Sequence, residues 1–87
     1  ISAKGLTSLT VEEGRIKHKM MQQAEMTVIL ADHSKFGREL FYKFADLSEV
    51  DLIITDRSPS PEMLELLDQH EVELWIADQS FSKELSL

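Results

Sequence analysis

The chain has 87 residues, enough for one small domain or a part of a larger one, and its 43% hydrophobic and 29% charged content is ordinary for a globular protein. Sixteen acidic against nine basic residues leave a formal net charge of −7, which argues against this chain gripping a nucleic-acid backbone. The lack of cysteine excludes a disulfide framework, a cysteine-ligated zinc site and a thiol nucleophile. We expect a soluble, acidic, cytoplasmic protein with no membrane span and, because it opens on Ile1 rather than Met, a fragment of a longer one.

The first predicted element is a helix over Val11–Gln23. Residues 1–9 show no clear period and are expected to form a loop that leads into it. Thr10 and Glu13 match a capping box, in which each side chain bonds the backbone amide of the other residue. Apolar residues at helical spacing are expected to face the core: Ile16, Met20 and Ala24.

Three short apolar runs predict β-strands, at Met26–Ala31, Val50–Thr55 and Val72–Ala77. The first run is rich in β-branched residues and typical of a buried strand. Between the first two, Arg38–Leu47 suits either a helix or a strand. Before the third, Ser60 and Pro61 are good starting residues for a helix over Glu62–His70, whose Met63, Leu66 and Leu67 should face inward. This order predicts a parallel α/β sheet, while Asp78–Leu87 receives no assignment.

Two of the predicted strands end in an aspartate followed by a polar loop, Asp32–Gly37 and Asp56–Ser58. Ligands of open α/β sheets bind outside the carboxyl ends of the strands, so a site is expected here. Lys35 offers a compact positive charge for phosphate, although a solvated loop lysine is the alternative. Asp32 could accept a bond from a sugar hydroxyl, orient Lys35, or simply cap its own loop.

The remaining candidates have simpler explanations. Glu13 could act as an acid or base, but the capping box accounts for it without a ligand. Lys17 follows Glu13 at i+4, the favourable orientation for an ordinary helical ion pair. The three histidines lack the spacing of metal ligands, and neither common glycine-rich phosphate loop is present. We therefore expect no metal and no cofactor.

Two sequence blocks are specific, VILADHSKFG at Val28–Gly37 and DLIITD at Asp51–Asp56, and two looser ones lie at Ile1–Thr7 and Glu13–Met20. Together, over about residues 1–77, they resemble the C-terminal sensor domain of DeoR-family bacterial transcriptional regulators. Gly14 stands where the family pattern leads us to expect alanine. The resemblance implies an α/β fold with a parallel Rossmann-like sheet and flanking helices.

Members of this family join an N-terminal winged helix-turn-helix to a sensor that binds a phosphorylated sugar or a related metabolite. The resemblance implies that residues 1–87 are the C-terminal part of such a sensor, without the DNA-binding module and without the first half of the sensor. Operator DNA would be contacted only through the missing module. The parent protein would be a homo-oligomeric repressor of carbohydrate metabolism.

The same sensors are similar to sugar-phosphate isomerases of the ribose-5-phosphate type, whose motifs are echoed by Lys4-Gly5 with Glu13 and by Asp32-x-Ser34-Lys35. The ligand contacts implied by the resemblance are Lys4, Gly5, Glu13, Lys17, Asp32 and Lys35. An isomerase-like enzyme is the alternative function, with Glu13 as base and Lys4 as electrostatic stabiliser.

Two departures from these patterns separate the alternatives. Glu12 and Gly14 replace the arginine and lysine that flank the acidic residue in the isomerases, which counts against catalysis. The interpretation as a receiver-type interaction domain has less support still, because that domain has an acidic cluster after its first strand and Asp32 is followed here by His33.

Overall fold

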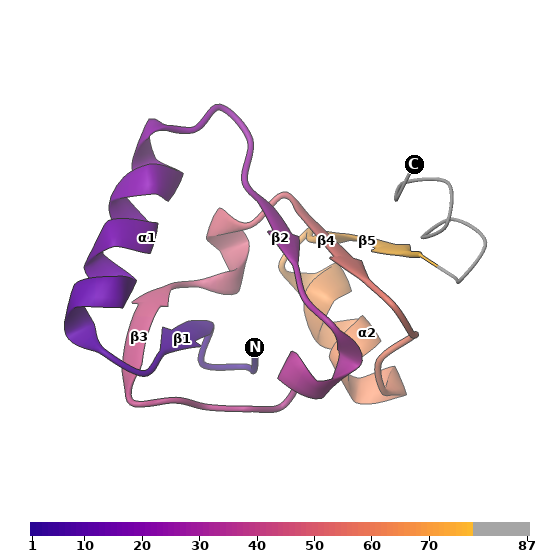
Figure 1. The fold of residues 1–87 in the computed structure, drawn as a ribbon. Helices are drawn as coiled ribbons and strands as arrows, with labels where there is room; N and C mark the ends of the chain where they lie inside the picture. Colours follow the sequence, from indigo (N-terminus) through magenta and orange to yellow (C-terminus); the bar gives the residue numbers. More distant parts are fainter. Residues whose placement is uncertain (78–87) are drawn as a thin grey trace, which may run out of the picture.

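The computed structural model describes residues 1–77, which form two β-sheets and two α-helices (Figure 1). The elements follow in the order β1 (Leu6–Ser8), α1 (Val11–Gln23), β2 (Val28–Leu30), β3 (Tyr42–Ala45), β4 (Leu52–Thr55), α2 (Pro61–Gln69) and β5 (Glu73–Ile76). Two short 3-10 helices, η1 (His33–Lys35) and η2 (Leu47–Glu49), flank β3. Neither helix of the described part has the length and apolarity that crossing a membrane requires. The tail Asp78–Leu87 lies outside the described residues.

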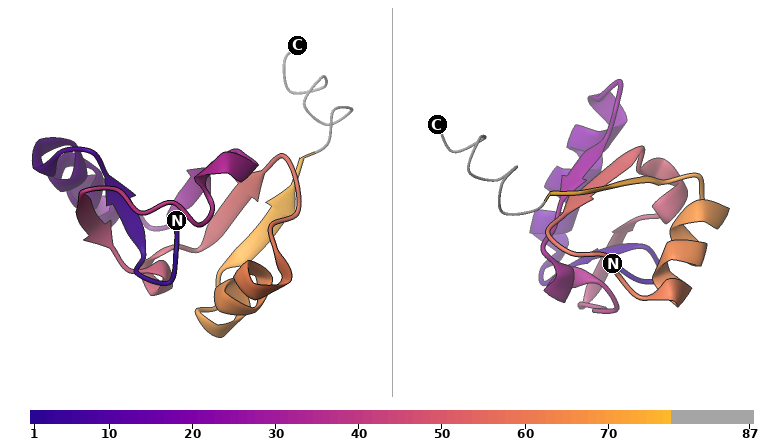
Figure 2. Two further views of the ribbon diagram at one scale, coloured as in Figure 1. Left: turned by 90° about the horizontal axis from the view of Figure 1, so that it is seen from below. Right: turned by 90° about the vertical axis from the view of Figure 1, so that its right-hand side faces the viewer.

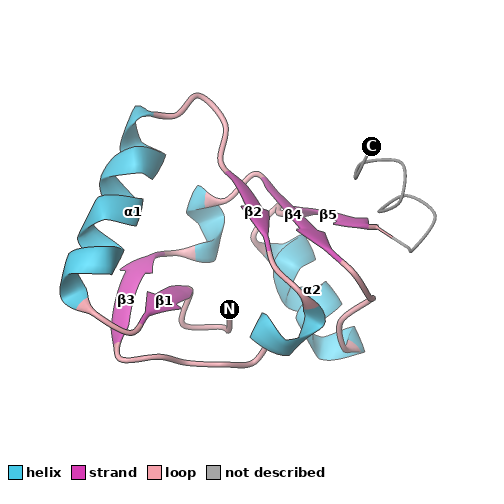
Figure 3. Ribbon diagram, in the orientation of Figure 1, coloured by secondary structure: helices cyan, strands magenta, loops and turns pink. Residues whose placement is uncertain are grey.

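The predicted parallel sheet is present, with strand order β2-β4-β5. Ile29, Ile53 and Leu74 occupy one row across the three strands, and Ile53 has no exposed surface. Helix α2 lies against one face of this sheet (Figure 3). As predicted, Ser60 caps α2 by accepting from the Met63 N–H at 3.2 Å, and Pro61 occupies the first turn. The core around Ile53 is built by this sheet and α2 together with Leu6 of β1 and Ala45 of β3.

A second sheet was not expected from the sequence. Strand β1 pairs antiparallel with β3, so the loop predicted for residues 1–9 is wrong, and Arg38–Leu47 contains a strand rather than a helix. Leu6 and Ser8 point inward and are almost fully buried, with Thr7 between them half-buried. The sequence does not reveal the alternation of inward and outward residues along β1, because the inward residue Ser8 is polar. The Ser8 hydroxyl is buried without cost because it donates to the carbonyl of Thr10 at 2.8 Å.

Helix α1 packs through a different face from the one predicted. Its apolar residues Ile16 and Met20 are 63% and 65% exposed, and Ala24 is also exposed. The inward stripe is Val11, Gly14, His18 and Met21, also at helical spacing, against β3 and β1. A Cβ on Gly14 would lie 2.7 Å from Tyr42 Cε2 and 2.8 Å from Ser8 Oγ, so glycine permits the close approach. Sequence reasoning missed this face because neither glycine nor histidine counts as apolar.

The sheet also has an open face. In the left view of Figure 2, α1 with β1 and β3 forms one arm of a V, and the parallel sheet with α2 forms the other. On the side away from α2, one row of the sheet holds Leu30, Ile54 and Trp75, of which Leu30 is 77% and Trp75 51% exposed. Val28 and Met26 are exposed too. The prediction of a fully buried first strand is therefore wrong, because α2 covers only one face and α1 packs elsewhere.

Candidate functional site

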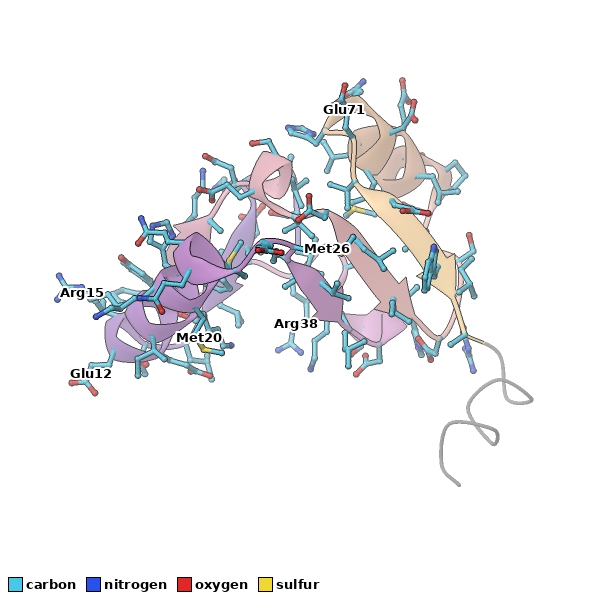
Figure 4. All side chains as sticks on the ribbon, turned by 90° about the horizontal axis from the view of Figure 1, so that it is seen from above. Glu12, Arg15, Met20, Met26, Arg38 and Glu71 are labelled. Carbon is cyan, nitrogen blue, oxygen red and sulfur yellow. The ribbon has the colours of Figure 1, made fainter. Side chains whose placement is uncertain are left out.

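An open groove of about 660 Å³ lies between α1 and β2. Its walls are mainly apolar, including Met20 of α1 and Val28 and Leu30 of β2. Three cationic residues also line it, Lys17, Lys35 and Arg38, in a chain whose net charge is −7. Met20, Met26 and Arg38 are labelled around the groove in Figure 4. The arrangement offers an apolar surface with positive charges placed along it, which suits an anion.

The loop after β2 carries Lys35 and is closed by its own side chains. Asp32 caps η1: its carboxylate accepts from the Ser34 N–H at 2.9 Å and from the Ser34 hydroxyl. These two bonds hold the pKa of the Asp32 carboxyl below its ordinary value. Of the alternatives that the sequence left open, the structure therefore supplies the cap, while Asp32 does not line the groove.

A second carboxylate, that of Asp56 after the end of β4, forms hydrogen bonds with His33 in the loop that carries Lys35. It accepts from the His33 N–H at 2.7 Å and pairs with the His33 Nδ1 at 2.8 Å. The hydrogen bond from the imidazole is the main cause that lowers the pKa of Asp56 from 3.8 to about 2. Sequence reasoning pointed to the loop at Asp56 but did not find this partner, because the two residues are separated by 23 positions.

The other end of the loop is held by Ile1. The Ile1 nitrogen lies 2.8 Å from the Lys35 carbonyl, and the Gly37 N–H donates to the Ile1 carbonyl at 2.6 Å. The Lys35 loop is thus fixed by backbone bonds on one side and by Asp56 on the other.

Lys4 and Gly5 lie in a tight turn in which Ser2 and Gly5 exchange two backbone bonds, and neither residue lines the groove. Lys4 is 73% exposed and pairs with Glu39 at 3.3 Å. Gly5 has φ +112 and packs against the backbone of Ala45, which gives it a structural role that its sequence position does not reveal.

Glu13 and Lys17 form the predicted i,i+4 ion pair at 3.4 Å. The Glu13 N–H donates to the Thr10 hydroxyl at 3.2 Å, which is the first half of the capping box, but the Glu13 carboxylate contacts Lys17 instead of supplying the second half. The Lys17 ammonium also lies 5.6 Å from the centre of the Phe44 ring. Of the six predicted contact residues, the groove brings together Lys17 and Lys35.

The residues named for the alternative enzyme make other contacts within residues 1–77. Glu13 and Lys4, its proposed base and stabiliser, each have an ion-pair partner and neither lines the groove. Within residues 1–77, no group of three or more histidine, aspartate or glutamate side chains is placed to hold a metal ion.

Comparisons with known proteins agree with one another. The family model described as the DeoR C terminal sensor domain matches residues 1–57. The HTH-type transcriptional repressor GlcR of Bacillus subtilis strain 168 is 46% identical over 84 residues, which are 97% of this chain and 33% of that protein. The deoxyribose operon repressor of Escherichia coli strain K12 is 32% identical over 72 residues, 83% of this chain and 29% of that protein.

A further relative is the glycerol-3-phosphate regulon repressor of the same Escherichia coli strain, 29% identical over 69 residues, 79% of this chain and 27% of that protein. The chain therefore spans about a third or less of the length of these relatives. All three are named as repressors.

Proposed function

We propose that this chain, which belongs to the DeoR C-terminal sensor domain family, is the effector-binding part of a transcriptional repressor of carbohydrate metabolism. The effector is a phosphorylated sugar or a related metabolite. The names of two relatives support this class, because one controls a deoxyribose operon and the other a glycerol-3-phosphate regulon.

The observation that carries the proposal is the position of Lys35. It lines the groove from η1, in the loop that follows the carboxyl end of β2, where α/β sheets bind ligands. No ion-pair partner for Lys35 occurs among residues 1–77, whereas Lys17 is already paired with Glu13. Lys35 is therefore the groove lysine whose charge is available to an anion, and Arg38 lies on the same groove to support it.

Control of DNA binding follows from linkage. An effector that releases the repressor from its operator must bind the DNA-free state more tightly, typically by about 1–3 kcal/mol of coupling. The net charge of −7 makes this chain a poor contact for DNA, so the operator is bound by a helix-turn-helix module elsewhere in the protein.

The intact sensor is larger than this chain. We propose that residues 1–87 are its C-terminal part, since the chain spans about a third of GlcR. The remaining part covers the exposed Trp75 of β5 and extends the three strands into a Rossmann-like sheet. The whole repressor is cytoplasmic and a symmetric homo-oligomer.

The proposal is tested by titration calorimetry on the full repressor that contains this chain, using inorganic phosphate and a panel of sugar phosphates. A charge-assisted contact contributes about 1.5–3 kcal/mol, so Lys35→Ala should weaken binding of the true effector about 10- to 100-fold. Lys19→Ala is the matched control, because Lys19 is also exposed but does not line the groove. Equal affinities of wild type and Lys35→Ala would make Lys35 a solvated loop residue.

A further inference from the structure

Both oxygens of the Asp56 carboxylate bond His33 of the neighbouring loop, and one of them also accepts from the Thr55 hydroxyl at 3.4 Å. One oxygen accepts from the backbone N–H of His33 at 2.7 Å, and the other pairs with the imidazole of His33 at 2.8 Å. Asp56 follows β4 directly, and His33 is the first residue of η1, which follows β2. These two bonds therefore tie together the carboxyl ends of two adjacent parallel strands.

The tie controls a very short segment. Helix η1 has three residues, from His33 to Lys35, so the orientation of its first residue determines the direction of its last. Asp32 bonds only Ser34 and closes the turn internally, without fixing the turn to the sheet. The connection to the sheet on this side is made by Asp56.

Folding stability alone does not account for such a pair. The side chains of His33 and Asp56 are 48% and 46% exposed, and ion pairs at that exposure contribute little to the free energy of unfolding. The effect of the pair is local: it fixes where the loop lies relative to the groove.

We propose that Asp56 is a positioning residue, which through His33 holds η1 in the orientation that presents Lys35 to the anionic group of the effector. This inference rests on the proposed function of Lys35. It extends the site to β4, a strand that supplies no groove-lining residue of its own.

Removing Asp56 should change the ligand affinity in the direction opposite to the one that charge repulsion alone predicts. A carboxylate near an anion site repels the ligand, so removing Asp56 should strengthen binding if its charge were all that mattered. If Asp56 acts through the loop, removing it should weaken binding. Should the untied loop hold Lys35 in the competent orientation only about a tenth of the time, the apparent affinity falls about tenfold.

The experiment measures the affinity of the full repressor for inorganic phosphate, and for whichever sugar phosphate binds the wild type, in a mutant cycle. Asp56→Ala should weaken binding about tenfold in the wild-type background and less than about twofold in a Lys35→Ala background, because both changes remove the same contact. Asp56→Asn keeps one acceptor oxygen for the His33 N–H, and its amide N–H can donate to the His33 Nδ1, so this variant without the charge should restore most of the affinity. Tighter binding by Asp56→Ala, or equal weakening in both backgrounds, would overturn the proposal.

Asp51→Ala is the matched control. Asp51 accepts from the Thr27 N–H at 2.7 Å and so ties the same two strands at their opposite ends, far from η1. It should leave phosphate affinity unchanged, and a loss equal to that of Asp56→Ala would mean that any strand tie matters. Hydrogen exchange over residues 32–37 adds a readout without ligand: exchange should rise in Asp56→Ala only. If no phosphate compound binds the wild type, the function proposed for Lys35 fails, while exchange still decides whether Asp56 holds the loop.

Discussion

Replacing Gly5 by alanine should destabilise the fold severely, although Gly5 resembles a ligand contact in sequence. Its φ of +112 is rarely adopted by residues with a side chain, a strain of about 1–3 kcal/mol. The added Cβ would lie 3.2 Å from the carbonyl carbon of Ala45 and would overlap its oxygen. Relieving that overlap means displacing β3 from β1, at a further cost of about 1–3 kcal/mol. After about 0.4–1 kcal/mol is subtracted for the stiffer unfolded chain, the loss is about 1–6 kcal/mol.

Gly37→Ala separates the two contributions. Gly37 also has a positive φ, +80, but an added Cβ meets no atom within 4 Å. This variant should lose only the backbone term of about 1–2 kcal/mol, reduced by the same amount of about 0.4–1 kcal/mol for the stiffer unfolded chain. Urea unfolding followed by circular dichroism measures both variants, and the difference between them isolates the contact with Ala45. The reasoning is refuted if Gly5→Ala is as stable as Gly37→Ala, or if it keeps wild-type stability and loses only ligand affinity.

Three further outcomes are expected. Thr10→Ala should lower the free energy of unfolding by about 1 kcal/mol because it removes the α1 cap. Glu13→Ala should lower it by at most about 0.5 kcal/mol because only an exposed ion pair is lost, and urea titrations compare the two variants. The carboxyl of Asp56 should titrate near pH 2 by NMR, and in His33→Gln its pKa should rise toward 3.8. Because the pKa of Asp56 is lower in the folded than in the unfolded chain, its contribution to folding stability is complete above about pH 3.8 and is lost as the pH falls through 2. The 87-residue chain with its charge of −7 should give no sequence-specific gel shift with operator DNA, and a salt-sensitive specific shift would contradict that expectation.

The elements with strong local signals are the ones that sequence reasoning predicts well. Helix α1 has the predicted bounds, α2 begins one residue earlier than predicted, and the three parallel strands fall inside the predicted runs. Each helix has a capping residue, and each of these strands lies in a mainly apolar run. Strand β1 has three residues and a polar inward position, so no local pattern marks it. Its existence depends on β3, a partner far along the chain.

The site was predictable only as a location. The strand-end rule directs attention to the loops at Asp32 and Asp56, and both lie at that edge of the sheet. Which lysine lines the groove depends on how α1 and β2 face each other, and that geometry follows from Gly14 and the inward face of α1. The bond between Asp56 and His33 is a tertiary contact that no spacing in the sequence encodes.

The pairing of β1 with β3 and of β2 with β4 has a consequence for how the protein folds. The two sheets alternate along the chain, so a cut anywhere between residues 9 and 51 separates at least one strand from its partner. Neither sheet can be completed before the chain has closed loops that span the other, and the entropy of that closure is lost before the pairing repays it. The two arms of the V therefore form one cooperative unit, in which the segment bearing Lys35 orders only when both sheets do.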